Sequence, residues 1–146
     1  MTLFEVSIRY SQSMENGLTK KVTETYLVDA QTFTEAEIRT TTETSYLTTG
    51  EMEVSAIKRS NITMVLPPAL ASDGQTLKWF RAKLNFIALD EKTAKEKKQA
   101  VYYAVYATDI DKAHRLIDKY MGDSVINYEF AAINDTKIVE FIKQHA

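Results

Sequence analysis

The residues that could do chemistry in this sequence are few and widely spaced. Among its 146 residues there are two histidines, His114 and His145, and no cysteine. A Ser-His-Asp triad needs a histidine, and thiolate catalysis or cysteine-ligated zinc needs a cysteine. His114 falls off the apolar stripe of a predicted helix, so we interpret it as a boundary or surface residue. His145 is next to last, so we interpret it as a tail residue. The sequence predicts no catalytic residue.

Acidic residues and glycines give no clearer signal. Asp109 and Asp111 open a predicted helix, where carboxylates complement the helix dipole. No loop has the acidic spacing of an EF-hand, and the four glycines form neither a phosphate-binding loop nor a dinucleotide fingerprint. We therefore expect no metal site, no cofactor and no enzymatic activity.

One group of cations and aromatic residues does indicate binding. In the predicted strand WFRAKLNF, Trp79, Arg81 and Lys83 alternate with an apolar set that we assign to the core. In the next strand, KKQAVYYAVYA, Tyr102 and Tyr106 alternate in the same way. If the five side chains share one face, cations would follow phosphates and rings would stack on bases. That is how single-stranded nucleic acid is bound.

Lys97 and Lys98 would add positive charge at the tip of this hairpin. The same residues have a structural interpretation, because lysines at a hairpin tip commonly provide solvation and protect sheet edges. Helices could also cover the tyrosines and make them part of the core. Both interpretations stay open at the level of sequence.

The elements that would position these residues form an internal repeat. KKVTETYLVDAQTFTEAE, which starts at Lys20, matches KKQAVYYAVYATDIDKAH, which starts at Lys97. The offset between the halves is 76 residues at Phe4 and Phe80 and 77 residues at Ala30 and Ala107. The same order of elements recurs in both halves, which indicates a duplicated fold.

Each half is predicted to be strand, strand, helix, strand and short helix. Thr32 and Glu35 form a capping box, and we expect the first helix to end at Gly50. Thr108 should cap the second helix, which Gly122 ends. The remaining predicted segments are strands 3–10, 20–30, 51–59, 79–89, 97–107 and 127–133, helix 109–121, and short helices 60–66 and 136–144.

These patterns predict an α+β fold. Repeats 1–66 and 77–146, joined by connector 67–76, would pack as one pseudo-symmetric domain of mostly antiparallel sheet with helices on one side. The second helix should bury the stripe that contains Ile110, Ala113, Ile117 and Tyr120. Because the repeat mimics a dimer, it favours a monomer.

The run MENG…KKVTE.YLVDA..FTEAE, followed by VSAIKR and later by KLNFI.LDEK, resembles a family of unknown function. This is the domain-of-unknown-function family (4494) found in Bacteroidetes and their phages and mobile elements. The resemblance covers nearly the whole chain. It implies an intracellular α+β protein and a phage or mobile-element setting, but no activity, because it brings no catalytic or binding residues with it.

Composition narrows the function further. The net charge of −2 gives no general attraction to nucleic acid, and no apolar run is long enough to cross a membrane. We expect a cytoplasmic protein that does not enter membranes. The leading hypothesis is a non-catalytic protein-interaction or inhibitor module. The alternatives are single-stranded nucleic-acid binding through the aromatic and basic face, and a small-molecule site at the seam between the repeats.

Overall fold

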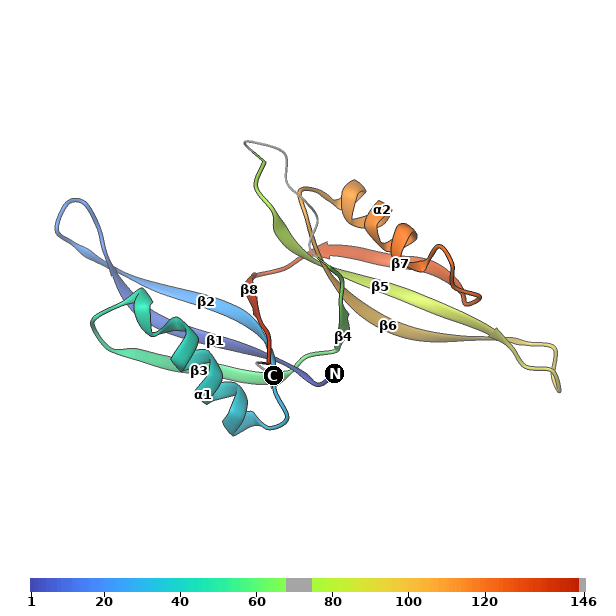
Figure 1. Cartoon of the computed structure of the whole chain (residues 1–146), viewed down its shortest axis with the longest axis horizontal. Coiled ribbons are helices and arrows are strands. Elements are labelled where there is room, and N and C mark those ends of the chain that lie inside the picture. Colours follow the sequence, from blue (N-terminus) through green and yellow to red (C-terminus); the bar gives the residue numbers. More distant parts are fainter. Residues whose placement is uncertain (68–74, 145–146) are drawn as a thin grey trace. The chain divides into compact units, whose positions relative to one another are not determined.

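The computed structural model describes residues 1–67 and 75–144, which fall into two compact units (Figure 1). The first unit contains Met1–Ser60 and Lys137–Ala146, and the second contains Asn61–Thr136. Each unit is a mixed sheet of four strands with one helix, so the predicted α+β class and the two similar halves are confirmed. Packing of the repeats as one domain stays a prediction, and most of connector 67–76 lies outside the described residues.

The first sheet has the strand order β3-β1-β2-β8. The strand β1 pairs antiparallel with both β2 and β3, and β8 joins the outer edge of β2 in parallel. Helix α1 and a short 3-10 turn connect β2 to β3. The elements are β1 (Leu3–Ser13), β2 (Thr19–Asp29), α1 (Phe33–Thr44), the turn (Ser45–Leu47), β3 (Met52–Arg59) and β8 (Ile138–Ile142).

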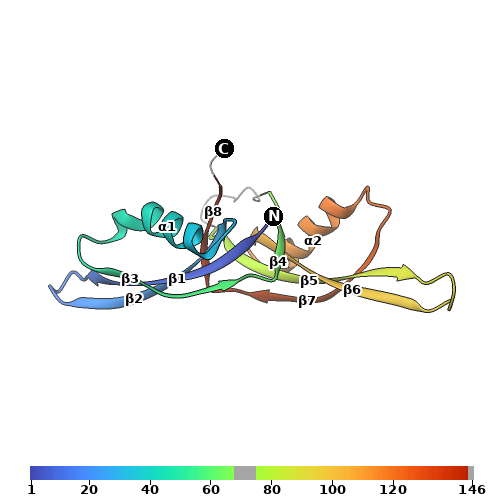
Figure 2. The same ribbon diagram turned by 90° about the horizontal axis from the view of Figure 1, so that it is seen from below.

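The second sheet repeats this plan in the order β4-β6-β5-β7. The strand β5 pairs antiparallel with β6 and β7, and β4 joins the outer edge of β6 in parallel. Its elements are β4 (Ile62–Val65), β5 (Lys78–Leu89), β6 (Glu96–Ala107), α2 (Ile110–Met121) and β7 (Asn127–Asp135). Within each unit the helix covers one face of the sheet (Figure 2). We call the opposite face the outer face.

Each unit has its apolar core between the sheet and the helix. Alternating side chains of β1 and β5 supply the centre of these cores, because successive residues of a strand point to opposite faces. The sequence of the first strand alternates apolar and polar residues, which predicts one buried face, and the structure confirms it: Phe4, Val6 and Ile8 are fully buried. In the second unit Phe80, Ala82 and Leu84 take the equivalent places, as their spacing predicts.

The two predicted short helices are wrong, because both segments are strands. The segment 60–66 contains β4, and 136–144 contains β8. Both segments are rich in β-branched residues, which pack well on a pleated sheet, and each has the length of an edge strand. Moreover, β4 is the last strand of the first repeat but pairs in the second unit, and β8 is the last strand of the second repeat but pairs in the first. The repeats thus exchange their last strands.

The first helix begins as predicted and ends early. The Thr32 hydroxyl accepts a hydrogen bond from the Glu35 amide at 3.1 Å, as a capping residue should. The helix then stops at Thr44 and not near Gly50. Its threonines explain the early end, because they have low helix propensity and their hydroxyls bond back to the preceding turn, as Thr40 does to the Ala36 carbonyl at 2.7 Å.

The second helix differs from its prediction at two points. Its N-cap is Asp109 and not Thr108, because the Asp109 carboxylate accepts the Lys112 amide at 2.8 Å. Its buried residues are Ala113, Ile117 and Met121, whereas Ile110 and Tyr120 are about half exposed. The buried stripe of α2 therefore ends at Met121 and not at Tyr120. Gly122 is the C-cap, as predicted.

Candidate functional site

The predicted aromatic and basic residues lie on the outer face of the second sheet. Cross-strand pairing sets Trp79 opposite Tyr106 and Lys83 opposite Tyr102, while Arg81 lies between them on β5. All five side chains point away from the core that packs on α2, since the alternate residues of both strands fill that core. The register therefore brings these five residues together on one face.

The aromatic end of this face is largely closed. The rings of Trp79 and Tyr106 lie 4.7 Å apart at an angle of 34°, and Trp79 is only 6% exposed. A base stacks on an exposed ring face, so the indole of Trp79 does not offer a stacking platform. Lys83 and Tyr102, further along the strands, are partly exposed, and so are Arg81 and Tyr106.

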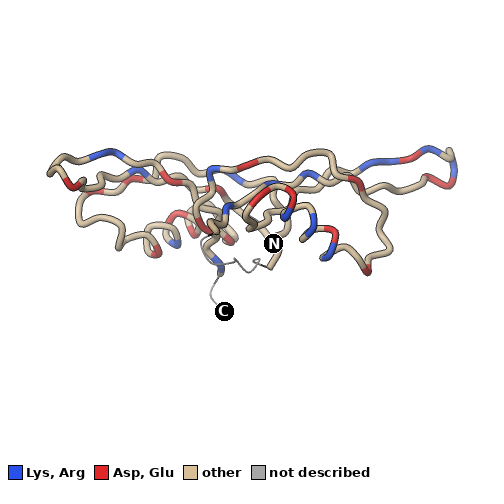
Figure 3. Tube along the Cα trace, turned by 90° about the horizontal axis from the view of Figure 1, so that it is seen from above, with Lys and Arg blue, Asp and Glu red and all other residues tan. Residues whose placement is uncertain are grey.

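The lysines of the hairpin are held by acidic partners. The Lys98 ammonium lies 2.8 Å from a Glu129 carboxylate oxygen, and the Asn85 amide donates to the same oxygen at 3.2 Å. The Lys97 ammonium lies 3.4 Å from Asp90. Figure 3 shows acidic and basic positions alternating along the segment that joins β5 to β6. The tip is a mixed-charge surface and not a positive one.

Local hydrogen bonds shift the pKa values of these charged groups. The bond to Glu129 raises the pKa of Lys98, and the bonds from Lys98 and Asn85 lower that of Glu129. The Lys92 backbone amide, which donates to Asp90, lowers the pKa of that carboxyl, and Lys97 adds to the effect. Each shift favours the charged form, so these pairs stay ionised around neutral pH.

The first unit carries different residues at the equivalent places. Offsets of 76 and 77 residues set Ser7 and Thr25 in the place of Lys83 and Tyr102. Their hydroxyls lie 2.9 Å apart and share a hydrogen bond. The first unit therefore has two small hydroxyl residues that bond to each other, whereas the second unit has a lysine beside a tyrosine at the same place.

His114 takes part in a small cluster on the other side of the second sheet. Its ring stacks on Phe130 with centroids 3.8 Å apart, and Nδ1 lies 3.1 Å from the Asp118 carboxylate. The Tyr128 hydroxyl donates to the same carboxylate at 2.8 Å, which raises the pKa of Tyr128. The half-exposed side chain of His114 agrees with its interpretation as a boundary or surface residue. His145 lies outside the described residues.

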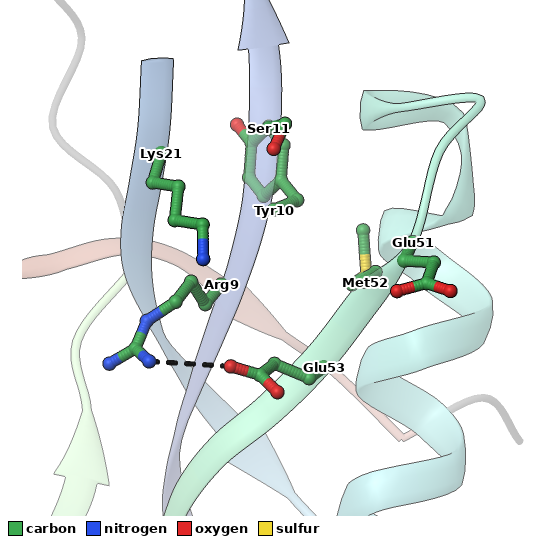
Figure 4. A pocket seen from close by; sticks show the side chains of 7 residues that line it. All are labelled: Arg9, Tyr10, Ser11, Lys21, Glu51, Met52 and Glu53. Atoms are coloured by element: carbon green, nitrogen blue, oxygen red, sulfur yellow. Dashed lines mark hydrogen bonds and ion pairs between the residues drawn. The ribbon is translucent and has the colours of Figure 1, made fainter. Parts of the chain in front are cut away.

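Sequence reasoning missed a second group of residues, on the outer face of the first sheet. A hollow of about 340 Å³ lies there (Figure 4). Its lining residues are Arg9, Ser11, Lys21, Glu51 and Glu53, together with Tyr10 and Met52. The sequence signal was present, because Arg9 alternates with the core residues of β1. This alternation alone does not indicate a site, because the sequence does not show the strand register that sets Arg9 opposite Glu53.

Comparison with known proteins identifies a family but no activity. Residues 2–144 match the family model described as "Domain of unknown function (DUF4494)", so the chain belongs to that family. No curated protein matches the chain. Across residues 1–67 and 75–144, no group of three or more histidine, aspartate or glutamate side chains could hold a metal ion, and neither helix could span a membrane.

Proposed function

We propose that this protein is a non-catalytic binding module that engages a protein partner through Lys83 and Tyr102. The observation that supports the proposal is the difference between the two units at this place. A lysine and a tyrosine face one another where the first unit has Ser7 and Thr25. Tyrosine is enriched at protein interfaces because it buries a large ring and keeps a polar hydroxyl.

The charges on this face favour a protein over nucleic acid. A single-strand platform needs a continuous positive track and exposed rings. Here Lys97 and Lys98 are paired with Asp90 and Glu129, and the ring of Trp79 is buried. Lys83 has no ion pair among the described residues, so its ammonium is available for an acidic side chain of the partner. An apolar surface of the partner, next to that acidic side chain, would pack on Tyr102.

The proposed setting is the cytoplasm of a cell that carries a phage or mobile element. The cysteine-free composition fits a reducing compartment. The phage or mobile-element setting rests on the family resemblance alone. An inhibitor would act by covering a surface of its partner, which needs no catalytic residue.

The test compares two double variants of the full chain. Lys83→Ser with Tyr102→Thr copies the first unit onto the second, and Ser7→Ala with Thr25→Val is the matched control. Proteins cross-linked to the wild-type chain in its host would be identified by mass spectrometry, purified and titrated by calorimetry. We expect the first variant to bind at least about 30-fold more weakly, as for a hot spot, and the control to bind normally.

Equal binding of the partner by wild type and by the Lys83/Tyr102 variant would overturn the proposal. A separate titration with a fluorescent single-stranded oligonucleotide decides the alternative. Tight binding that weakens steeply with salt and is lost in the Lys83/Tyr102 variant would replace the protein partner by nucleic acid.

A further inference from the structure

The hollow on the first unit is lined by Lys21, whose counterpart in the second unit, Lys98, forms an ion pair with Glu129. The same offsets relate Arg9, Lys21 and Glu53 to Asn85, Lys98 and Glu129. The register supports this equivalence, because Arg9 is opposite Glu53 and Asn85 is opposite Glu129. The two units therefore carry the same three-strand constellation, with one exchange of an arginine for an asparagine.

That one exchange changes which cation the glutamate binds. In the second unit the asparagine is short, so Lys98 reaches across the middle strand to Glu129 at 2.8 Å. In the first unit the guanidinium of Arg9 occupies the glutamate, with Nη1 3.3 Å from Glu53 Oε1. The Lys21 ammonium consequently has no hydrogen bond or ion pair with any part of the chain that the structure describes.

The result is a pair of cations beside an open volume. Figure 4 shows the Lys21 ammonium directed toward the side chain of Arg9, with Ser11 on the neighbouring strand. Arg9 commits one nitrogen to Glu53 and keeps its other N–H groups for a ligand. Two like charges side by side repel one another, and a bound anion would relieve that repulsion.

Two carboxylates also line the hollow, and they limit its affinity. Glu53 is neutralised by Arg9. Glu51 is exposed and lies on the side of the hollow away from Lys21 (Figure 4). The side near Lys21 therefore keeps an excess of positive charge, although the lining as a whole contains two cations and two anions.

We propose that this hollow binds the phosphate group of a small molecule. A guanidinium fork, an ammonium and a hydroxyl donate from different directions, which suits the oxygens of a tetrahedral oxyanion better than a planar carboxylate. The volume of about 340 Å³ is at the small end of ligand sites. This site lies on the first unit, so it is independent of the partner face proposed on the second.

The test is a titration of the full chain with inorganic phosphate, followed through backbone amide resonances at an ionic strength held constant with chloride. We expect saturable shifts centred on Ser11, Lys21 and Glu53, with a dissociation constant on the order of a millimolar. Lys21→Gln should weaken binding by about tenfold, since it removes one charge-assisted hydrogen bond.

Two further variants make the test specific. Arg9→Asn rebuilds the arrangement of the second unit, frees Glu53 to bind Lys21, and should abolish the shifts. Lys98→Gln is the matched control and should leave them unchanged. Shifts that never saturate, that centre on Lys97 and Lys98, or that saturate with an unchanged dissociation constant in Lys21→Gln would overturn the proposal. Acetate binding as tightly as phosphate would overturn the assignment to phosphate.

Discussion

The two units of this protein agree on their helix-facing sides and differ on their outer faces. Each core position of β1 has an apolar counterpart on β5, from Phe4 and Phe80 to Ile8 and Leu84. On the outer faces Glu5 corresponds to Arg81, Ser7 to Lys83 and Arg9 to Asn85. Packing tolerates few alternatives in a core, whereas an outer face can change without unfolding the unit. The difference teaches that function should be sought on the outer faces.

The largest expected effect tests the agreement between the cores. Ile8→Ala and Leu84→Ala each remove a fully buried side chain from the centre of a sheet. We expect each to lower the free energy of unfolding by about 3 kcal/mol, the usual cost of such a cavity. Urea unfolding followed by circular dichroism measures this. A loss below about 1 kcal/mol in one variant only would show that the two cores are not equivalent.

Alkaline pH should open the first unit before the second, because two of its core tyrosines, Tyr10 and Tyr26, share one carboxylate and have the larger rise in pKa. The Tyr10 hydroxyl donates to Glu24 at 2.6 Å, and this hydrogen bond raises the pKa of Tyr10 to about 12. Burial also raises the pKa of Tyr26, whose hydroxyl lies 3.4 Å from the same carboxylate. The second unit has Phe86 in the place of Tyr10.

The direction of the pH effect follows from linkage. Tyrosine is neutral when protonated, and its folded pKa exceeds the ordinary value of 10.0. The stabilisation is therefore complete below pH 10 and is lost as the pH rises from 10 to 12. Amide hydrogen exchange should show the first unit opening earlier than the second. Glu24→Gln should lower the tyrosine pKa, as read from tyrosinate absorbance; an unchanged titration would contradict the role of Glu24.

The hairpin tips offer a smaller effect with a built-in control. Gly17 has φ +81° in the first hairpin, and Ala94 has φ 55° at the equivalent place in the second. A left-handed residue costs less as glycine because it lacks a Cβ. We expect Ala94→Gly to increase the free energy of unfolding by about 1 kcal/mol and Gly17→Ala to decrease it by about the same amount. The midpoint of thermal unfolding should rise in the first variant and fall in the second. Shifts of the same sign in both variants would contradict this explanation.

The smallest expected effect concerns the helices. Thr40 is fully buried in α1 where α2 has Ile117, and its hydroxyl bonds back to the Ala36 carbonyl. That carbonyl also belongs to the helix ladder, so removing the hydroxyl orphans no buried group. Thr40→Val should stabilise the protein by about 0.5 kcal/mol, measured by urea unfolding. Any destabilisation beyond about 1 kcal/mol would show that the hydroxyl has a role that its geometry does not reveal.

Much of the fold could be predicted because alternation and repetition are local signals. The strand patterns of β1 and β5 assigned the right side chains to the core, and the offset between the halves found the equivalent elements. The strands β4 and β8 could not be assigned, because an apolar run of four or five residues has no decisive period. Their place was determined by free edges on β6 and β2, which belong to the other repeat.

The candidate site was predicted in its residues but not in their availability. Alternation set Arg81, Lys83 and Tyr102 on one face, and the register agrees. The burial of Trp79 and the ion pair of Lys98 with Glu129 depend on contacts between residues far apart in sequence, and the ion pair of Lys97 with Asp90 depends on how the hairpin turns. The hollow beside Arg9 depends on such contacts as well, since the Lys21 ammonium stays unpaired among the described residues only because Arg9 forms the ion pair with Glu53.

The exchange of β4 and β8 has a consequence for a chain that is cut. A protease that cleaved after Pro67 would leave a fragment that supplies β1, β2 and β3 to one sheet and β4 to the other. The second fragment would supply β5, β6 and β7 to the latter sheet and β8 to the former. Two interlocked polypeptides would result, held by two parallel strand pairings in place of a peptide bond. They should elute as one species in native gel filtration and separate only in denaturant.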